Sequence, residues 1–270
     1  MKIRISLVHY LNAAPLGWSF LHGPHRDRFE VIPASPARCA EQLALGEVDI
    51  GVIPSIEYQR IPNLTIIPGI AIAALDAVRS VLMVRHRDRV IRTVALDTSS
   101  RTSVELLKLL LQVRMGLRPT YIHHAPDLPT MLDSCDAALL IGDAALKVTA
   151  GDYEILDLAQ AWVEWQQRPF VFAFWACRSG ALFPEDLASV FLDARDWGLS
   201  ARALIVQDYA RRLNLPEDFL NQYLSRNVNY DMGAGHIEGL ERFYQLAWAS
   251  GLIPENRPLR FLSPLQINPK

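Results

Sequence analysis

Residues 95–111 read ALDTSSRTSVELLKLLL, and this stretch decides the fold class. Its first residues end a short apolar segment that is typical of a buried strand. From Val104 onward the apolar residues recur at helical spacing, at Val104, Leu107 and Leu111. Every residue in between, from 97 to 103, carries a hydroxyl group or a charge. A strand that passes through a polar turn into a helix predicts an α/β protein.

The hydroxyl-rich turn has the chemistry of an anion site. A helix start leaves about four backbone N–H groups without an intrahelical partner. These donors, the helix dipole and the hydroxyl groups of the turn all favour a bound anion. The turn contains no glycine, unlike a phosphate-binding P-loop, so a smaller anion such as a carboxylate is favoured. The alternative is that one Ser or Thr simply caps the helix.

Composition sets the broad class of the protein. The chain has 270 residues, half of them hydrophobic, and a formal net charge of −2, which suits one large domain or two small ones. With no Lys/Arg run, neither nucleic acid nor an anionic membrane is expected as the main partner. Cys39, Cys135 and Cys177 are odd in number and far apart, which fits a reducing compartment. No secretory signal pattern and no apolar run of about 18 residues occur, so we expect a cytoplasmic protein.

Two further strand ends carry polar residues. Asn12 follows the alternating strand pattern of residues 3–8, and Ser55 follows the apolar segment 50–53 after Pro54. Open α/β sheets bind their ligands beyond the carboxyl ends of their strands. Both residues are therefore candidates for a binding site. The alternatives are ordinary turn chemistry for Asn12 and helix capping for Ser55.

The order of elements predicts two similarly built lobes. After a charged connector at 86–92, a second β–α series runs to residue 141, and residues 136–143 (DAALLIGD) echo residues 49–55 (DIGVIPS). We expect crossovers near 80–85 and 170–177, with residues 1–85 and 178–270 forming the first lobe and 86–177 the second. Such a plan would place a ligand crevice between the lobes and allow hinge closure. A helix is expected over 157–165 and an apolar strand over 170–177. The remainder is expected to be helical, over 184–197, 200–213 (capped by Ser200), 217–226 and 235–249.

Common catalytic and cofactor motifs do not account for these features. The sequence has no HExxH zinc motif, no GxSxG elbow and no GxGxxG fingerprint. His123 and His124 are adjacent and would face opposite sides of a strand, so no metal site is expected. The glycines at 232–235 are interpreted as a turn. The aromatic residues at 162–175 are interpreted as core packing, with a pocket for a ring-shaped ligand as the alternative.

Taken in order, several segments resemble one family, the chorismate dehydratases of the futalosine route to menaquinone. A further similar stretch lies in the helical tail, at residues 238–240. The matching segments are 10–13 (YLNA), 46–58 (GEVDIGVIPSIEY), 78–82 (VRSVL), 97–104 (DTSSRTSV), 137–143 (AALLIGD) and 169–176 (PFVFAFWA).

The resemblance implies a type II periplasmic-binding-protein-like fold that serves as a cytoplasmic enzyme. It implies removal of water from chorismate to give 3-[(1-carboxyvinyl)oxy]benzoate, without a metal or cofactor. By position, Asn12 matches the Asn held to be important for catalysis. The residues expected to bind substrate lie in the same segments: Ser55, Arg79, Ser80, Ser99, Thr102, Ser103, Gly142 and Asp143.

The sequence departs from the family pattern in three places. His9 stands where a small residue is expected, residues 166–168 (QQR) replace a Thr-Gly-containing turn, and residues 75–77 (LDA) replace a Gly-Pro-like turn. Two other functions stay open: the 1,4-dihydroxy-6-naphthoate-forming enzyme of the same pathway, and a non-catalytic binding protein for a small carboxylate. No motif position marks a general base, which suggests that the substrate's own side-chain carboxylate takes the proton.

Overall fold

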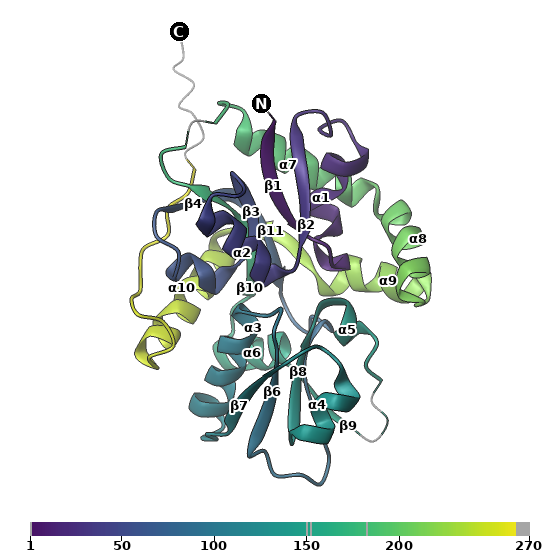
Figure 1. Cartoon of the computed structure of the whole chain (residues 1–270), viewed down its shortest axis with the longest axis vertical. Helices are drawn as coiled ribbons and strands as arrows, with labels where there is room; N and C mark the ends of the chain where they lie inside the picture. The colour runs from purple at the N-terminus through teal and green to yellow at the C-terminus, as the bar shows by residue number, and fades with distance from the viewer. Residues whose placement is uncertain (1, 150, 152, 182, 263–270) are drawn as a thin grey trace.

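The computed structural model describes residues 2–262 apart from 150, 152 and 182. It has two mixed β-sheets, each with its own helices, stacked one above the other in Figure 1. The upper sheet contains β1 (Ile3–Val8), β2 (Phe29–Ala34), β3 (Ile50–Pro54), β4 (Leu64–Ala74), β10 (Phe170–Arg178) and β11 (Asn229–Met232). The lower sheet contains β5 (Val81–His86), β6 (Thr93–Asp97), β7 (Thr120–His124), β8 (Ala137–Ile141) and β9 (Tyr153–Asp157).

The helices divide between the two sheets, which we call the first and second lobes. Those of the first lobe are α1 (Ala14–His22), α2 (Pro36–Leu45), α7 (Leu187–Ser200), α8 (Arg202–Leu213), α9 (Glu217–Gln222) and α10 (Ala234–Ala249). Those of the second are α3 (Thr102–Leu109), α4 (Leu128–Ser134), α5 (Gly142–Leu146) and α6 (Leu158–Gln166). Short helical turns are η1 (Leu11–Ala13), η2 (Ser55–Gln59), η3 (Leu110–Arg114) and η4 (Tyr223–Asn227).

The two lobes repeat one strand order, which confirms that they are similarly built. The first sheet runs β2-β1-β3-β10-β4-β11 and the second β7-β6-β8-β5-β9. In each, three parallel strands are followed by an antiparallel one, β10 against β3 and β5 against β8. The acidic residues that precede β3 and β8 make equivalent hydrogen bonds. Asp49 accepts the Arg4 N–H beside β3, and Asp136 accepts the Thr93 N–H beside β8.

Local sequence signals account for the helix ends closest to the lobe interface. Ser35 caps α2 by accepting the Arg38 N–H, Pro36 is its first residue, and Gly46 ends it with a φ of 74°. Helix α3 begins at Thr102, inside the hydroxyl-rich turn, and continues through the π-helical turn η3. The predicted strand–turn–helix unit is therefore confirmed.

Three expected local features differ in the structure. Residues 153–157 form the edge strand β9, although its few residues alternate too briefly to stand out from the helix that follows. Residues 229–232 form β11, because β4 is long enough to pair with a further strand at the outer edge. Ser200 does not cap α8: it is the last residue of α7, and its hydroxyl donates back to the Trp197 carbonyl.

Sheet membership places the crossings between lobes slightly earlier than the expected boundaries. Strand β5 belongs to the second sheet, so the first crossing falls within residues 75–80. Strand β10 belongs to the first sheet, so the return crossing falls within residues 167–169. Backbone pairing drives this arrangement, because β10 fills the position between β3 and β4. The lobe limits 1–85, 86–177 and 178–270 stay a prediction.

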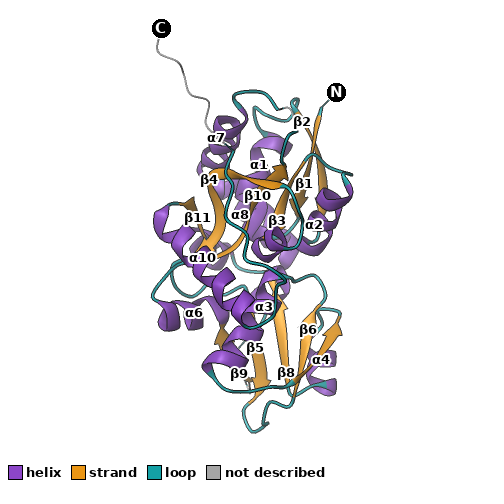
Figure 2. Cartoon of the chain, turned by 90° about the vertical axis from the view of Figure 1, so that its left-hand side faces the viewer, coloured by secondary structure: helices purple, strands orange, loops and turns teal. Residues whose placement is uncertain are grey.

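One apolar core runs through both lobes near their junction. Trp162 of α6 is fully buried and packs edge-on against Phe170 of β10 and Phe243 of α10. Helix α10 contacts both β10 and α3, so it bridges the two lobes (Figure 2). Trp162 is therefore a packing residue, as expected.

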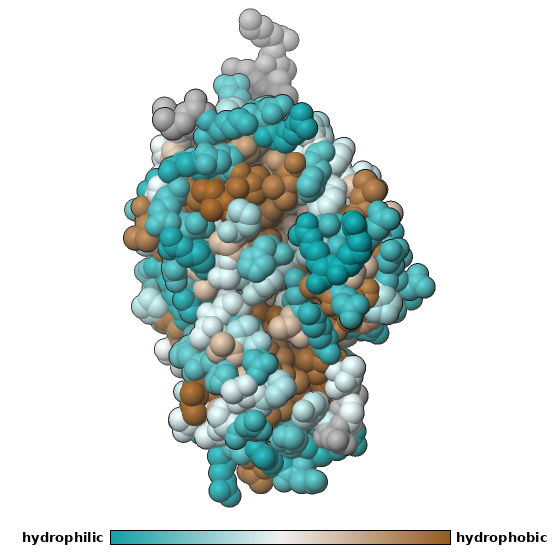
Figure 3. All heavy atoms as spheres, turned by 45° about the vertical axis from the view of Figure 1, so that its right-hand side comes forward, coloured by the Kyte–Doolittle hydropathy of each residue, from teal (hydrophilic) through white to brown (hydrophobic). Residues whose placement is uncertain are grey.

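The outer surface is mostly polar on the face shown in Figure 3, with apolar patches on both lobes. Scattered apolar side chains of this kind are usual on folded proteins. Within the described residues, none of the helices is both long and apolar enough to cross a bilayer.

Candidate active site between the lobes

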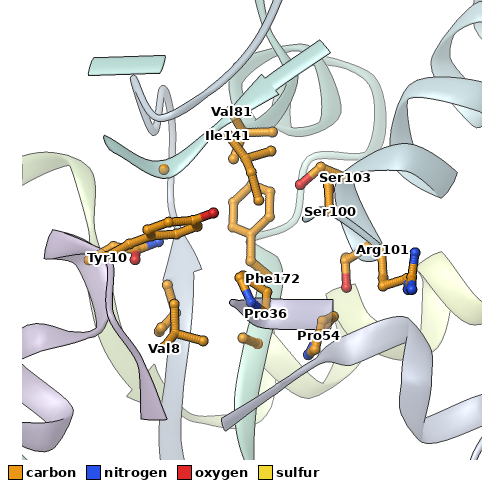
Figure 4. Close-up of a pocket in the computed structure, with 15 residues that line it drawn as sticks. Val8, Tyr10, Pro36, Pro54, Val81, Ser100, Arg101, Ser103, Ile141 and Phe172 are labelled. Atoms are coloured by element: carbon orange, nitrogen blue, oxygen red, sulfur yellow. The ribbon is translucent and has the colours of Figure 1, made fainter. Parts of the chain in front are cut away.

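A cavity lies where the strand ends of the two lobes face each other. It encloses about 480 Å³ of empty space, part of it open to solvent. The first lobe contributes Val8, Asn12, Pro36 and Pro54, and the second contributes residues 100–103, Ile141 and Gly142. Phe172 of β10 also lines the cavity (Figure 4). The cavity thus has apolar walls with polar groups concentrated on the hydroxyl-rich turn and Asn12.

A buried carboxylate shapes the hydroxyl-rich turn. Asp97 is 1% exposed, and one of its oxygens accepts the Ser99 N–H at 2.8 Å and the Ser99 hydroxyl at 2.6 Å. Its other oxygen accepts the Ile141 N–H from the end of β8. Burial raises the pKa of Asp97, and these donors partly oppose that rise. Asp97 therefore ties the ends of β6 and β8 together beneath the cavity.

Two polar atoms at the cavity have no hydrogen-bond partner among the described residues. They are Oδ1 of Asn12 and Oγ of Ser100, both fully shielded from solvent. Buried polar atoms without partners are costly, by about 1–3 kcal/mol each. Both residues line the cavity. A ligand that satisfies them must offer a donor to Asn12 and an acceptor or donor to Ser100, and the two side chains must turn toward it, because neither oxygen is reached by solvent.

The segment around Asn12 is fixed by the opposite lobe. The Tyr10 hydroxyl donates to Ser99 Oγ at 3.0 Å, and the Leu11 N–H donates to Oδ1 of Asp143 at 2.9 Å. Figure 4 shows Tyr10 and Ser103 entering the cavity from opposite sides. Burial raises the pKa of the Asp143 carboxyl, while the Leu11 N–H stabilises its ionised form.

Charge at the cavity is limited to one side chain. Among the described residues that line it, only Arg101 carries a formal charge, and its guanidinium pairs with Glu41 of α2 at 3.3 Å. The Arg101 guanidinium is directed away from the cavity in Figure 4, so an anionic ligand would find the start of α3 and the turn hydroxyls on that side. Within the described part of the chain, no three His, Cys, Asp or Glu residues are grouped as a metal site.

The structure separates the predicted site residues into two groups. Asn12, Thr102, Ser103 and Gly142 line the cavity. The others surround it and serve the fold: Ser55 donates to the Val171 carbonyl, Ser80 accepts from Tyr223, Ser99 links Tyr10 to Asp97, Asp143 holds Leu11, and the exposed Arg79 has its backbone N–H on Asp157.

The predicted site does not include Tyr10, Ser100 and Phe172, which are among the other residues that line the cavity. Tyr10 lies two residues before Asn12, and Ser100 lies inside the hydroxyl-rich turn. The sequence feature that points to both is therefore their closeness to predicted site residues. Phe172 was assigned to the core with its aromatic neighbours. It is 7% exposed and turns one side to the cavity, so the pocket alternative applies at this residue, whereas Trp175 is core.

One family model and two relatives match most of the chain in sequence. The family model described as "Menaquinone biosynthesis" matches residues 3–249. A chorismate dehydratase of Thermus thermophilus is 33% identical over 268 residues, covering 92% of this chain and 94% of the relative. A chorismate dehydratase of Campylobacter jejuni is 24% identical, covering 91% of this chain and 97% of the relative.

Solved structures give the fold. A protein of Archaeoglobus fulgidus superposes with a TM-score of 0.75 at 19% identity, covering 93% of this chain and 98% of its own. The periplasmic aliphatic sulphonate binding protein of Escherichia coli superposes with a TM-score of 0.68 at 18% identity, covering 100% of this chain and 94% of its own. The fold is periplasmic-binding-protein-like, as expected. Because the family model matches residues 3–249 of this chain and a relative is 33% identical to it, the chain belongs to the menaquinone biosynthesis family.

Proposed function

We propose that this protein is a hydro-lyase that removes water from chorismate to give 3-[(1-carboxyvinyl)oxy]benzoate. The observation that carries the proposal is the interlobe cavity in which Asn12 and Ser100 keep unpartnered buried atoms beside a hydroxyl-rich helix start. The family and the two dehydratase relatives support the choice of chorismate. Chorismate carries two carboxylates, which suit the polar side of the cavity, and a ring, which suits its apolar walls.

Substrate binding follows from the two kinds of wall. Thr102 and Ser103 are nearly buried, at 3% and 5% exposure, at the start of α3. They would hold one carboxylate through charge-assisted hydrogen bonds at the start of the helix. Phe172 would lie against the ring, since aromatic and apolar surfaces pack favourably. The cavity thus orients the substrate by its charge at one side and its ring at the other.

The reaction removes the C3 proton and the C4 hydroxyl, and aromatisation drives it. Among the described residues that line the cavity there is no His, Lys, Asp or Glu to serve as a base. We infer that the substrate's own side-chain carboxylate takes the C3 proton while the protein positions it. The Asn12 amide, which both donates and accepts, would orient that carboxylate or the departing hydroxyl.

The location of the reaction is part of the proposal. Cys39, Cys135 and Cys177 are all buried free thiols, which suits the reducing cytoplasm. On this basis we propose that the protein works in the cytoplasm.

The test is incubation of the purified chain with chorismate and no additive. The expected result is a product lighter by one water, with loss of the diene absorbance and appearance of benzoate ring protons by NMR. Turnover that survives a chelator would agree with the expected lack of a metal requirement. Chorismate that binds and returns unchanged would favour a carboxylate-binding protein. Cleavage of a cyclic futalosine to a naphthoate would instead identify the related enzyme of the pathway.

A further inference from the structure

Asp143 contacts the opposite lobe rather than the cavity. It stands in the first turn of α5, at the carboxyl end of β8, and its Oδ1 accepts the Leu11 N–H across the interface. Leu11 is fully buried, and its neighbour Asn12 is the cavity-lining amide. The sequence position that resembles a substrate contact is therefore occupied by a carboxylate whose partner is the backbone of the Asn12 turn.

A direct substrate role fits this carboxylate poorly. Asp143 is not among the residues that line the cavity, and a dicarboxylate ligand would be repelled by a further negative charge. Burial raises the pKa of Asp143, and the Leu11 donor, with His9 and Lys147, favours its ionised form. Asp143 itself is half-buried, whereas Leu11 is fully buried, so without this carboxylate the Leu11 N–H would be a buried donor that lacks its partner.

The geometry of Asn12 depends on the turn that Asp143 holds. The turn is the 3₁₀ unit η1, with backbone bonds from the Ala13 N–H to the Tyr10 carbonyl and from the Ala14 N–H to the Leu11 carbonyl, and with no side-chain cap. Among the described residues, the side-chain acceptors for the Tyr10 hydroxyl and the Leu11 N–H both come from the second lobe. An amide that acts in a transition state needs a backbone that is held closely in place.

We propose that Asp143 is a positioning residue that sets Asn12 for turnover through the Leu11 N–H. This inference rests on the proposed dehydratase function. Asp143 acts only when the lobes are together, since its partner lies on the first lobe. It therefore couples lobe closure to the placement of the reacting amide.

Kinetics on four variants tests the coupling. Asp143→Ala lowers kcat for chorismate by about tenfold, with a change in KM below about threefold, as expected for a residue whose effect is on the transition state. Asp143→Asn keeps an acceptor oxygen and recovers most of the lost kcat. In an Asn12→Ala background, Asp143→Ala has less than about a twofold further effect, because the residue it positions is gone.

Asp136→Ala is the matched control. It removes a carboxylate at the opposite end of the same strand β8, where Asp136 accepts the Arg92 and Thr93 N–H groups. It is expected to lower stability and leave kcat unchanged. Equal tenfold losses from Asp143→Ala in both backgrounds would overturn the proposal, as would a loss that Asp143→Asn does not repair.

A second measurement needs no turnover. Hydrogen–deuterium exchange resolved at the Leu11 amide becomes at least about tenfold faster in Asp143→Ala and stays near the original rate in Asp143→Asn. Unchanged Leu11 exchange in Asp143→Ala would refute the proposed contact. The unmodified protein could fail to dehydrate chorismate while Leu11 exchange still changes as expected in the variants. That outcome would contradict the proposed function and would still support the positioning of the Asn12 turn by Asp143.

Discussion

The Tyr10 ring lies against Gly142 so closely that a Cβ on Gly142 would come within 2.5 Å of Tyr10 Cδ2. The two residues belong to opposite lobes, Tyr10 after β1 and Gly142 after β8. Gly142 also has a φ of 59°, a conformation that residues with a side chain rarely adopt. The absence of a side chain at this position therefore allows the first lobe to seat its Tyr10 on the second.

Gly142→Ala should displace Tyr10 and loosen the cavity. We expect kcat/KM for chorismate to fall by at least about tenfold, since a lost transition-state contact of about 1.4 kcal/mol gives that factor. Steady-state kinetics measures the effect. Gly116→Ala is the matched control, because Gly116 has a φ of 70° and nothing within 4 Å of its Cβ position. Equal kinetic losses in both variants would show that backbone strain, not the Tyr10 contact, is responsible.

Asn12→Ala should reduce turnover more than binding. Its Oδ1 is buried and unpartnered among the described residues, so the ligand is its expected partner. We expect kcat to fall at least about tenfold, the equivalent of roughly 1.4 kcal/mol, with little change in KM. Asn229→Ala, on the edge strand β11 and outside the cavity lining, is the control. A near-normal kcat in Asn12→Ala would reduce Asn12 to a turn residue.

Ser103→Glu should abolish binding of a carboxylate ligand. Ser103 is 5% exposed in the first turn of α3, so a new charge there would face the bound anion. At a separation of about 4 Å the repulsion is about 4 kcal/mol for an effective dielectric constant of 20. Calorimetry with a 3-substituted benzoate measures the loss. Ser103→Gln, of the same size and neutral, should bind more tightly than Ser103→Glu, and equal affinities would remove Ser103 from the carboxylate site.

Ligand binding should close the lobes about the two crossings. The apolar core around Trp162 and α10 joins the lobes near the crossings, whereas at the cavity they meet through polar contacts such as those of Ser99 and Asp143, which must break for the cavity to open. Small-angle scattering should show a smaller radius of gyration with product than without. Identical profiles would indicate a cavity that is permanently closed.

Acid should selectively weaken the protein through Asp49. The hydrogen bond from Arg4 holds the pKa of Asp49 below its ordinary value. Such a carboxylate stabilises the fold above its unfolded pKa of about 4, and the stabilisation is lost as pH falls through the folded pKa. Asp49→Asn should therefore cost up to about 1 kcal/mol of unfolding free energy at pH 7 and progressively less below about pH 4. Urea unfolding at several pH values measures this.

The control for this pH effect is Asp27→Asn, which changes an exposed loop carboxyl. It should alter the unfolding free energy little at any pH. A cost for Asp49→Asn that is the same at low and neutral pH would show that the ion pair does not contribute through its charge.

The sequence by itself determined the strand–turn–helix unit at residues 93–111, the limits of α2 and the two-lobed plan. Each depends on local rules: apolar periodicity, a Ser-Pro start, a Gly end and the repeated Asp-strand pattern. The edge strands β9 and β11 escaped prediction because edge strands are short and are fixed by a neighbour rather than by their own residues.

Only the tertiary structure decided which polar residues reach the cavity. Ser99 and Ser100 are adjacent hydroxyl residues, yet Ser99 bonds to Asp97 and Tyr10 while Ser100 lines the cavity and its buried hydroxyl has no partner among the described residues. Asp143 and Gly142 are adjacent too, and one holds Leu11 while the other admits Tyr10. The direction of each side chain depends on packing between the two lobes. The residues that meet there are about 90 to 130 positions apart in the chain. The residues next to each side chain in the sequence therefore do not predict that packing.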